Sequence, residues 1–211
     1  MEYNISVIVK EGDIMDYLSE LEKLIKQKNG IITTKDVTNA GIPRIYLSKY
    51  AEENEIEHPE RGIYVAKDAF ADDMYMSQCK YKQAVFSHDS ALFLHDLTDR
   101  VPVQNTVTVK SGYNTANIKK TGAKVYMVKK ELYELGLTTL QTTFNNPVKA
   151  YDMERTICDI VRSRKNIEIQ VFTDAFKMYV RRKDKNLHNL MDYAQQFKVQ
   201  SILRKYLEVL L

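Results

Sequence analysis

Residues 29–66 read NGIITTKDVTNAGIPRIYLSKYAEENEIEHPERGIYVA, and this stretch decides the fold of the first part of the chain. Thr33, followed three residues later by Asp36, has the pattern of a capping box, in which each side chain accepts a hydrogen bond from the other residue's backbone. Gly41 supplies the positive φ of a tight turn. Pro43 suits the first position of a new helix. We therefore predict two short helices separated by a tight turn, over 35–40 and 43–54.

The second of these helices has one apolar face and one face rich in hydrogen-bond donors. The apolar side chains recur at helical spacing, so we expect them to be buried: Ile42, Tyr46, Leu47, Tyr50 and Ala51. Arg44, Ser48 and Lys49 fall on the other face, with Ile45 at its edge. Their donors suit phosphates and base edges in the major groove of DNA. An ordinary solvated helix surface would show the same residues, so the interpretation depends on the pattern as a whole.

A β-hairpin is predicted directly after the second helix. Ile56 and the run 62–65 look like two strands around a turn at 58–61, which places Arg61 at the tip of the hairpin. An amphipathic helix over 15–28 and a short apolar strand at 31–32 come before the two short helices. This order of helix, strand, two helices and hairpin is typical of a winged helix-turn-helix.

We therefore predict an α+β chain whose residues 1–78 form a winged helix-turn-helix DNA-binding domain. The alternation in residues 1–13 fits either a strand or a loose tail, and both alternatives stay open. The boundary segment 70–78 contains no helix breaker, so it is compatible with a helix. The donors expected to contact DNA from this domain are Thr34, Lys35, Arg44, Ser48, Lys49 and Arg61.

The second domain, residues 82–211, is predicted to be a mixed α/β domain that ends in a helical bundle. Asp152 is expected to cap a helix that follows it directly. The other predicted helices cover 84–97, 168–183, 186–197 and 199–210, and residues 129–135 fit either a short helix or a turn. Strands are predicted over 105–110, 123–128, 138–144 and 148–151, with a loop over 111–122.

The charge of the chain is distributed unevenly. Residues 1–70 carry 9 Lys or Arg against 13 Asp or Glu, a balance of −4, whereas residues 80–211 carry 22 against 13, a balance of +9. Non-specific affinity for DNA comes mostly from Lys and Arg that meet phosphates. Either the acidic residues lie away from the DNA, or the second domain assists binding. The candidate contacts in the second domain are Lys119, Lys120, Arg181, Arg182 and Lys183, although a solvated helix end explains the last three equally well.

Composition is that of a globular protein, with 44% hydrophobic and 28% charged residues. No run of about 18 apolar residues is present, so we expect no membrane-spanning helix. The N-terminus lacks the basic start and apolar core of a signal peptide. Cys79 and Cys158 lie far apart, which favours reduced thiols and a cytoplasmic protein over a disulfide.

The sequence suggests no catalytic, metal or cofactor site. His88, Asp89 and Ser90 are neighbours on a predicted helix, so their side chains point in different directions and cannot form a triad. His88 and His95 are seven residues apart and lack a third metal ligand. Asp152 and its neighbour Glu154 are explained by helix capping. We therefore expect a protein that is not an enzyme.

Three segments together resemble the AbiEi family of antitoxins from type IV toxin–antitoxin systems of bacterial abortive infection, a form of phage defence. They are GIPRIYLSKYAEENEIEHPERGIYV at 41–65, AVFSHDSALFLHDLTDRVPVQNTVTV at 84–109 and VKAYDMERTICDIVRSR at 148–164. The resemblance implies a transcription repressor that binds inverted repeats in its own promoter. It also implies an antitoxin that counters a nucleotidyltransferase-like toxin without forming a stable complex with it. A chain that is monomeric in solution and cooperative on DNA fits this expectation.

Two other functions remain as alternatives at this point. The second domain of a winged-helix regulator can sense a small ligand, for which it would need an apolar pocket with a few convergent polar groups. An enzyme could instead use the His-, Asp- and Ser-rich segment at 87–96. Neither the operator sequence nor the identity of the toxin follows from the residues.

Overall fold

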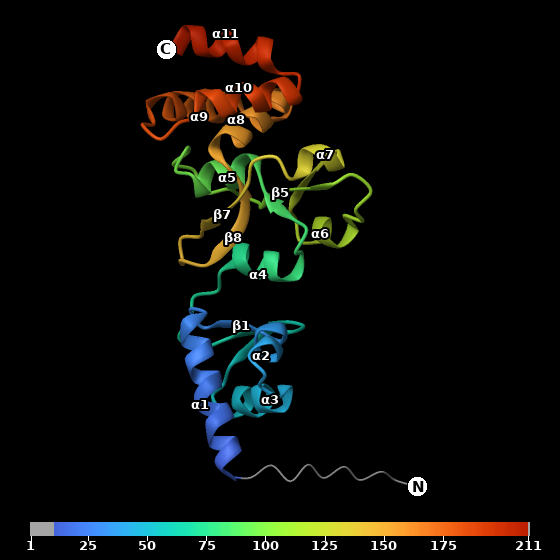
Figure 1. Cartoon of the computed structure of the whole chain (residues 1–211), viewed down its shortest axis with the longest axis vertical. Coiled ribbons are helices and arrows are strands. Elements are labelled where there is room, and N and C mark those ends of the chain that lie inside the picture. Colours follow the sequence, from blue (N-terminus) through green and yellow to red (C-terminus); the bar gives the residue numbers. More distant parts are fainter. Residues whose placement is uncertain (1–10, 211) are drawn as a thin grey trace. The chain divides into compact units, whose positions relative to one another are not determined.

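The computed structural model describes residues 11–210 (Figure 1), so the alternation predicted for 1–13 lies largely outside the described residues. The chain divides into two compact units. Unit 1 comprises the residues up to Cys79 together with 144–146, and unit 2 comprises 80–143 and 147–211. Each unit combines helices with a β-sheet, so the chain is α+β.

Unit 1 begins with a long helix, followed by two short helices and three short strands. In chain order these are α1 (Glu11–Gln27), β1 (Ile31–Thr33), α2 (Thr34–Asn39), α3 (Arg44–Glu53), β2 (Glu57–Glu60) and β3 (Ile63–Val65). The strands form an antiparallel sheet in the order β1-β3-β2, in which Ile31 pairs with Val65. The three helices and the sheet enclose one apolar core, formed by Leu21, Ile25, Ile32, Val37, Ile42, Tyr46 and Leu47.

The capping box predicted between Thr33 and Asp36 is confirmed. The backbone N–H of Asp36 donates to Thr33 Oγ1 at 3.1 Å, and the backbone N–H of Thr33 donates to Asp36 Oδ2 at 2.9 Å. Gly41 has the predicted positive φ, 77°. Pro43 is the N-cap of α3 rather than its first residue, so that helix begins one residue later than predicted. These local signals place α2 and α3 on either side of a tight turn.

The turn of the hairpin begins three residues later than predicted. Glu60 pairs with Ile63, which leaves a two-residue turn at Arg61 and Gly62. Residues 58–60, which were predicted in the turn, belong to strand β2, whereas Arg61 lies in the turn as predicted. Gly62 has a φ of 77°, a left-handed conformation that glycine adopts without steric cost. Pro59 is tolerated within β2 because β2 is an edge strand, where a missing N–H costs no ladder hydrogen bond.

Unit 2 contains a five-stranded mixed sheet in the order β6-β5-β4-β8-β7. The strands are β4 (Val85–Phe86), β5 (Thr106–Lys110), β6 (Lys124–Val128), β7 (Leu137–Gln141) and β8 (Pro147–Tyr151). The pairs β4–β8 and β5–β6 are parallel, and the pairs β4–β5 and β7–β8 are antiparallel. Helix α4 (Asp73–Lys80) ends unit 1, and only its last residue belongs to unit 2. The helices of unit 2 are α5 (His88–Leu94), α6 (Ala116–Lys120), α7 (Lys130–Tyr133), α8 (Met153–Arg162), α9 (Ile169–Arg181), α10 (Leu187–Gln196) and α11 (Gln200–Leu210). A 3₁₀ turn, η1 (Arg164–Asn166), lies between α8 and α9 in the sequence.

Helix α8 is the centre of unit 2. Every residue from Met153 to Val161 is buried. Asp152 caps the helix as predicted, because its side chain accepts a hydrogen bond from the backbone N–H of Arg155 at 2.8 Å. Helices α5, α9, α10 and α11 supply the apolar side chains around it. The C-terminal helices thus pack around α8 above the sheet (Figure 1).

For three segments of unit 2, the structure differs from the prediction in the type of element or in its bounds. Residues 84–97 do not form one helix, because Val85 pairs with Thr108 in the sheet and the chain turns at His88, whose φ is 48°. The predicted loop 111–122 contains helix α6. The strand predicted over 138–144 ends at Gln141, whereas the strand predicted over 105–110 is confirmed as β5 apart from its first residue. In the described part of the chain, no helix is long and apolar enough to cross a membrane, and no disulfide joins the two cysteines.

Candidate nucleic-acid interface

Helix α3 presents the predicted donors to solvent. Tyr46 and Leu47 are buried in the core of unit 1, at 7% and 1% exposure. The side chains expected on the opposite face are exposed: Arg44, Ser48 and Lys49. The helix is therefore anchored through one face and free to contact a ligand through the other, as its periodicity predicted.

Arg44, the first residue of α3, is tied to helix α2. Its Nε donates to Thr38 Oγ1 at 3.2 Å, and the Thr38 hydroxyl in turn donates to the backbone carbonyl of Thr34 at 2.8 Å. This chain of hydrogen bonds restricts the guanidinium while using only one of its donors. Arg44 is exposed, so its terminal NH₂ groups can form a bidentate contact with a base edge or a phosphate. The sequence did not reveal the role of Thr38, because the contact depends on how α2 and α3 cross.

The turn of the hairpin is fixed against the start of α2. The backbone N–H of Thr34 donates to the carbonyl of Gly62 at 3.0 Å. A Cβ on Gly62 would lie 3.0 Å from Thr34 Oγ1, so only glycine fits there comfortably. The backbone N–H of Gly62 also donates to His58 Nε2 at 3.1 Å, and the His58 ring packs on Tyr64. Arg61 is exposed on this anchored turn.

The candidate donors of unit 1 therefore come from three neighbouring parts of the fold. Thr34 and Lys35 begin α2, Arg44 begins α3, and Arg61 lies on the hairpin turn. Thr34 is half-buried under that turn, and its backbone already has hydrogen-bond partners, whereas Lys35 is exposed. Thr34 is thus placed to support the turn more than to reach a ligand.

Acidic residues flank this group on one side. They occupy the last turn of α3, the link between α3 and β2, and strand β2 itself, and all are exposed: Glu52, Glu53, Glu55, Glu57 and Glu60. Glu55 forms an ion pair with Lys67. Since carboxylates repel phosphates, the C-terminal half of α3 is unsuited to lie against a DNA backbone. The first turn of α3 is the part of the helix suited to enter a groove.

In unit 2 the predicted basic residues form two separate groups. Lys119 and Lys120 end helix α6, and Arg181 ends helix α9, with Lys183 shortly after it. Figure 1 draws α6 and α9 well apart within unit 2. The described structure does not bring the two groups together into one basic surface.

Arg182 differs from its basic neighbours because it already has an acidic partner. Its Nε and one terminal nitrogen donate to the two carboxylate oxygens of Asp184, both at 2.8 Å. The hydrogen bond from Arg182 holds the pKa of the Asp184 carboxyl below its usual value. The charge of Arg182 is thus compensated locally, and its contribution to phosphate binding is expected to be small.

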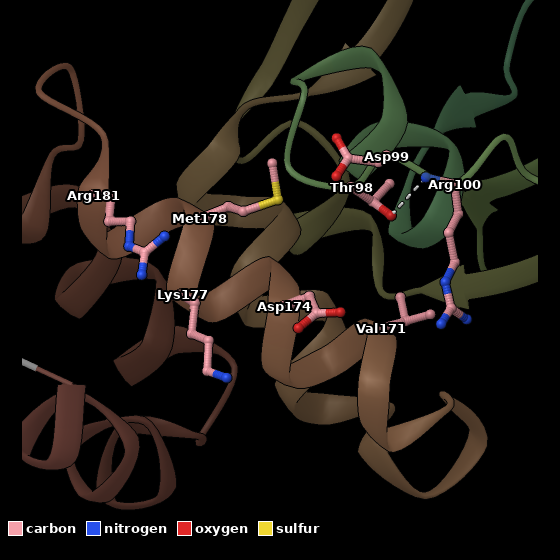
Figure 2. Close-up of a pocket in the computed structure, with 8 residues that line it drawn as sticks. All are labelled: Thr98, Asp99, Arg100, Val171, Asp174, Lys177, Met178 and Arg181. Carbon is pink, nitrogen blue, oxygen red and sulfur yellow. Dashed lines mark hydrogen bonds between the residues drawn. The ribbon is translucent and has the colours of Figure 1, made fainter.

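Arg181 lines a cleft of about 350 Å³ between helix α9 and the loop after α5 (Figure 2). Lys177 lies one turn before it on the same helix. Asp99 and Asp174 line the same cleft, with Val171 and Met178 as its apolar part. The lining contains both cations and carboxylates, so the electrostatic potential of the cleft is of mixed sign and does not favour a phosphate.

His88, from the segment for which a catalytic role was considered, is buried in the core of unit 2. His88 is 0% exposed, and its ring stacks on Tyr126 with ring centroids 3.5 Å apart. Its ring nitrogens lie 3.0 Å from the hydroxyls of Ser87 and Ser163. Burial lowers the pKa of His88 well below its usual value, helped by the positive charges of Arg162, Lys124 and Arg155. A neutral imidazole with both nitrogens engaged suits a structural role.

Ser90 also has a structural explanation. Its backbone N–H donates to Thr106 Oγ1, and its hydroxyl accepts from the backbone N–H of Thr106, both at 2.8 Å. Ser87 Oγ accepts from the Thr108 hydroxyl at 2.8 Å. These contacts join the turn before α5 to strand β5. Within residues 11–210, no group of three His, Cys, Asp or Glu side chains is arranged to hold a metal ion.

A buried ion pair organises helix α8. Arg155 Nε donates to Asp159 Oδ2 at 3.0 Å, and both side chains are fully buried. Arg155 Nη1 also donates to the carbonyls of Leu132 and Leu135 at 2.6 and 2.7 Å. Its guanidinium is sandwiched between the rings of Tyr151 and Phe197. Arg155 therefore links α8 to the end of α7 and to α10, and this structural role accounts for a buried arginine at this position.

Comparison with known proteins agrees with the resemblance inferred from the sequence. Residues 19–67 match the family model described as the AbiEi antitoxin, a transcriptional regulator, and this match confirms the predicted resemblance to AbiEi antitoxins. The matched residues lie in unit 1 and include the whole of α2, α3 and the hairpin. No curated protein matches the chain.

The chain is also similar to the crystal structure of the RV2827C protein from Mycobacterium tuberculosis. The TM-score is 0.54, the sequence identity is 12%, and the similarity covers 85% of this chain and 71% of that chain. At this identity the likeness shows a common fold alone.

Proposed function

We propose that this chain is a DNA-binding antitoxin that represses its own operon by reading inverted repeats in the promoter through unit 1. In this proposal unit 1 is a winged helix-turn-helix, α3 is its recognition helix, and the β2–β3 hairpin is its wing. The observation that carries the proposal is the placement of Arg44. It starts an exposed recognition helix, held by Thr38 with its terminal nitrogens free for a base edge.

The distribution of charge in unit 1 supports sequence-specific rather than non-specific binding to DNA. Unit 1 carries more acid than base, so phosphate attraction alone would bind DNA poorly. A group of donors on the start of α2, the first turn of α3 and the wing would instead gain affinity by entering the grooves. The candidate contacts are Thr34, Lys35, Arg44, Ser48, Lys49 and Arg61.

Unit 2 is proposed to add phosphate contacts and to carry the antitoxin role. Its net charge of +9 supports the first part. The candidate phosphate contacts are Lys119, Lys120, Arg181, Arg182 and Lys183. The second part rests on the resemblance of the segments at 84–109 and 148–164 to AbiEi antitoxins, because the match to the family model itself lies in unit 1. The proposed partner is a nucleotidyltransferase-like toxin that is countered without a stable complex.

The DNA-binding part is tested by a mobility-shift assay with the duplex that lies upstream of the gene. A shuffled duplex of the same length and base composition is the matched control. We expect tighter binding to the upstream duplex, with a footprint over two inverted repeats. Equal affinity for both duplexes at several salt concentrations would contradict sequence-specific repression.

The antitoxin part is tested separately by co-expression with the adjacent open reading frame. We expect growth arrest when that frame is expressed alone and recovery when this chain is supplied in trans from an unrelated promoter. The unrelated promoter removes any contribution from repression. Growth arrest that this chain leaves unchanged would contradict the antitoxin role without affecting the DNA-binding proposal.

A further inference from the structure

Ile45 is an apolar side chain in an unusual place. It is 58% exposed on helix α3, whereas the next two residues, Tyr46 and Leu47, are buried. It does not belong to the apolar core of unit 1 as the structure describes it. A β-branched residue is also a weaker helix former than Ala, Lys or Glu at an exposed position. Neither core packing nor helix formation therefore explains this isoleucine.

The position of Ile45 is that of a base-reading residue. It is the second residue of α3 and directly follows Arg44. Residues three and four apart share a helix face, so Ile45 lies on the same face as Ser48 and Lys49. In helix-turn-helix proteins the N-terminal residues of the second helix contact base edges in the major groove. Ile45 is thus an apolar group among donors, at the end of the helix suited to enter the groove.

The chemistry of the major groove supplies a partner for such a group. Thymine displays its C5 methyl there, whereas the other base edges display hydrogen-bond donors and acceptors. A branched aliphatic side chain gains by burying that methyl and cannot satisfy a donor or acceptor. We propose that Ile45 contacts a thymine C5 methyl next to the base pair that Arg44 contacts. This inference rests on the proposed function and adds a thymine to the sequence that unit 1 reads.

The test uses uracil, which lacks the C5 methyl but keeps every hydrogen-bonding group of thymine. The upstream duplex is prepared once with thymine and once with uracil at every thymine position. The dissociation constants of the wild-type protein and of Ile45→Ala are measured on both. We expect the wild type to bind the uracil duplex about three- to fivefold more weakly, as the loss of one buried methyl predicts. Ile45→Ala should bind the thymine duplex more weakly by a similar factor and should show no such preference.

Two controls separate the contact from other effects. Uracil also alters duplex stiffness, but this change acts equally on both proteins, so the difference between their thymine-to-uracil ratios reports the contact of Ile45. Val103→Ala truncates another exposed branched side chain, one that lies outside the proposed DNA contacts, and it should keep the wild-type ratio. Single uracil substitutions should then locate the effect at one position in each repeat.

The outcomes that overturn the inference differ from those that overturn the proposed function. If the wild type and Ile45→Ala show the same thymine-to-uracil ratio, with far-ultraviolet circular dichroism unchanged, Ile45 does not read a methyl group. If Ile45→Ala binds as the wild type does on both duplexes, the side chain is not in the groove. If the wild type shows no preference for the upstream duplex over a shuffled one, the proposed DNA reading fails, and this inference fails with it.

Discussion

Arg44 and Thr38 are joined by a hydrogen bond of 3.2 Å between the Nε of the arginine and the hydroxyl of the threonine. The bond crosses the turn between α2 and α3, and the threonine hydroxyl donates onward to the carbonyl of Thr34 at 2.8 Å. The proposed base-reading arginine is therefore oriented before any DNA arrives. Ordering a long side chain in advance lowers the entropy lost on binding.

Thr38→Ala should weaken specific binding without removing any proposed DNA contact. The loss of one hydrogen bond to a charged group predicts a change of about 1 kcal/mol in the binding free energy, or about fivefold in the dissociation constant. Thr38→Ser keeps the hydroxyl and should restore most of the affinity. Binding of Thr38→Ala at the wild-type level would show that the orientation of Arg44 in the free protein does not matter for binding.

Arg61→Ala should reduce the salt dependence of DNA binding. If Arg61 meets one phosphate, the slope of log K against log salt should fall by about 0.9. The matched control is Lys67→Ala, because Lys67 is exposed but already paired with Glu55. An unchanged slope for Arg61→Ala would place the wing turn away from the phosphates.

Lys183→Ala should reduce DNA affinity more than Arg182→Ala. Both residues follow helix α9, but the guanidinium of Arg182 donates to both oxygens of Asp184, whereas Lys183 is exposed. A phosphate contact by Lys183 predicts a slope change of about 0.9, with a smaller change for Arg182. The same salt titration on the upstream duplex measures both. Equal losses would mean that the ion pair with Asp184 opens on DNA.

Acidification should destabilise unit 2 through His88. Burial lowers the pKa of this imidazole below the ordinary histidine value of about 6.5, so below that pH the unfolded chain binds a proton that the folded chain does not bind. The contribution of the neutral, buried His88 to the stability of the folded state is therefore present above about pH 6.5 and is lost as the pH falls below that value. For one such group the free energy of unfolding should fall by up to about 1.4 kcal/mol per pH unit.

This pH dependence can be assigned by comparing two variants in urea unfolding followed by circular dichroism between pH 7 and pH 5. His88→Gln should be less stable at pH 7 but should lose less stability on acidification than the wild type. His188→Gln should stay close to the wild-type profile, because the contact of His188 with Asp192 lies on the surface, where an ion pair contributes little to stability. His95, whose pKa is also lowered mainly by burial, accounts for acid sensitivity that remains in His88→Gln. A His88→Gln profile parallel to that of the wild type would contradict the burial of a neutral imidazole.

The elements of unit 1 were predictable because their signals are local. Each signal involves residues only a few positions apart: the capping box between Thr33 and Asp36, the positive φ of Gly41, and the helical spacing of apolar residues that include the buried Tyr46 and Leu47. The start of the hairpin turn was placed too early because Pro59 suggests a turn, whereas an edge strand can contain a proline. The position of Arg61 in the turn was predicted correctly. Which strand lies at the edge depends on pairing with β1, which no short sequence window contains.

The misassigned part of unit 2 depends on contacts that are distant in sequence. Val85 and Phe86 continue the apolar pattern of the next helix, and only their pairing with β5 makes them a strand. Ser87 directly precedes helix α5, where a helix-capping bond is expected, but its hydroxyl accepts from Thr108 instead. Helix α8 was predicted well because its cap, Asp152, is local and strong.

The sequence predicted which face of α3 carries the candidate site, but it could not predict the hydrogen bonds of the individual side chains. Periodicity separates Arg44 and Lys49 from the core, and the structure agrees. Periodicity cannot show that Thr38 holds Arg44, because this depends on the crossing of two helices. Nor can it show that Asp184 compensates Arg182, because this depends on the conformation of the turn after α9.

The central claim is that the first turn of α3 reads base pairs through Arg44, and a competition assay with two variants tests it most directly. The dissociation constants of the wild type, Arg44→Ala and Arg44→Lys are measured on the upstream duplex and on a shuffled duplex. We predict that Arg44→Ala weakens binding to the upstream duplex by about 1–3 kcal/mol, with a much smaller loss on the shuffled duplex. Arg44→Lys should keep the shuffled affinity while recovering little of the specific affinity, because an ammonium group lacks the planar pair of donors. Equal losses on both duplexes would make Arg44 a phosphate contact, and wild-type binding by Arg44→Ala would contradict the claim outright.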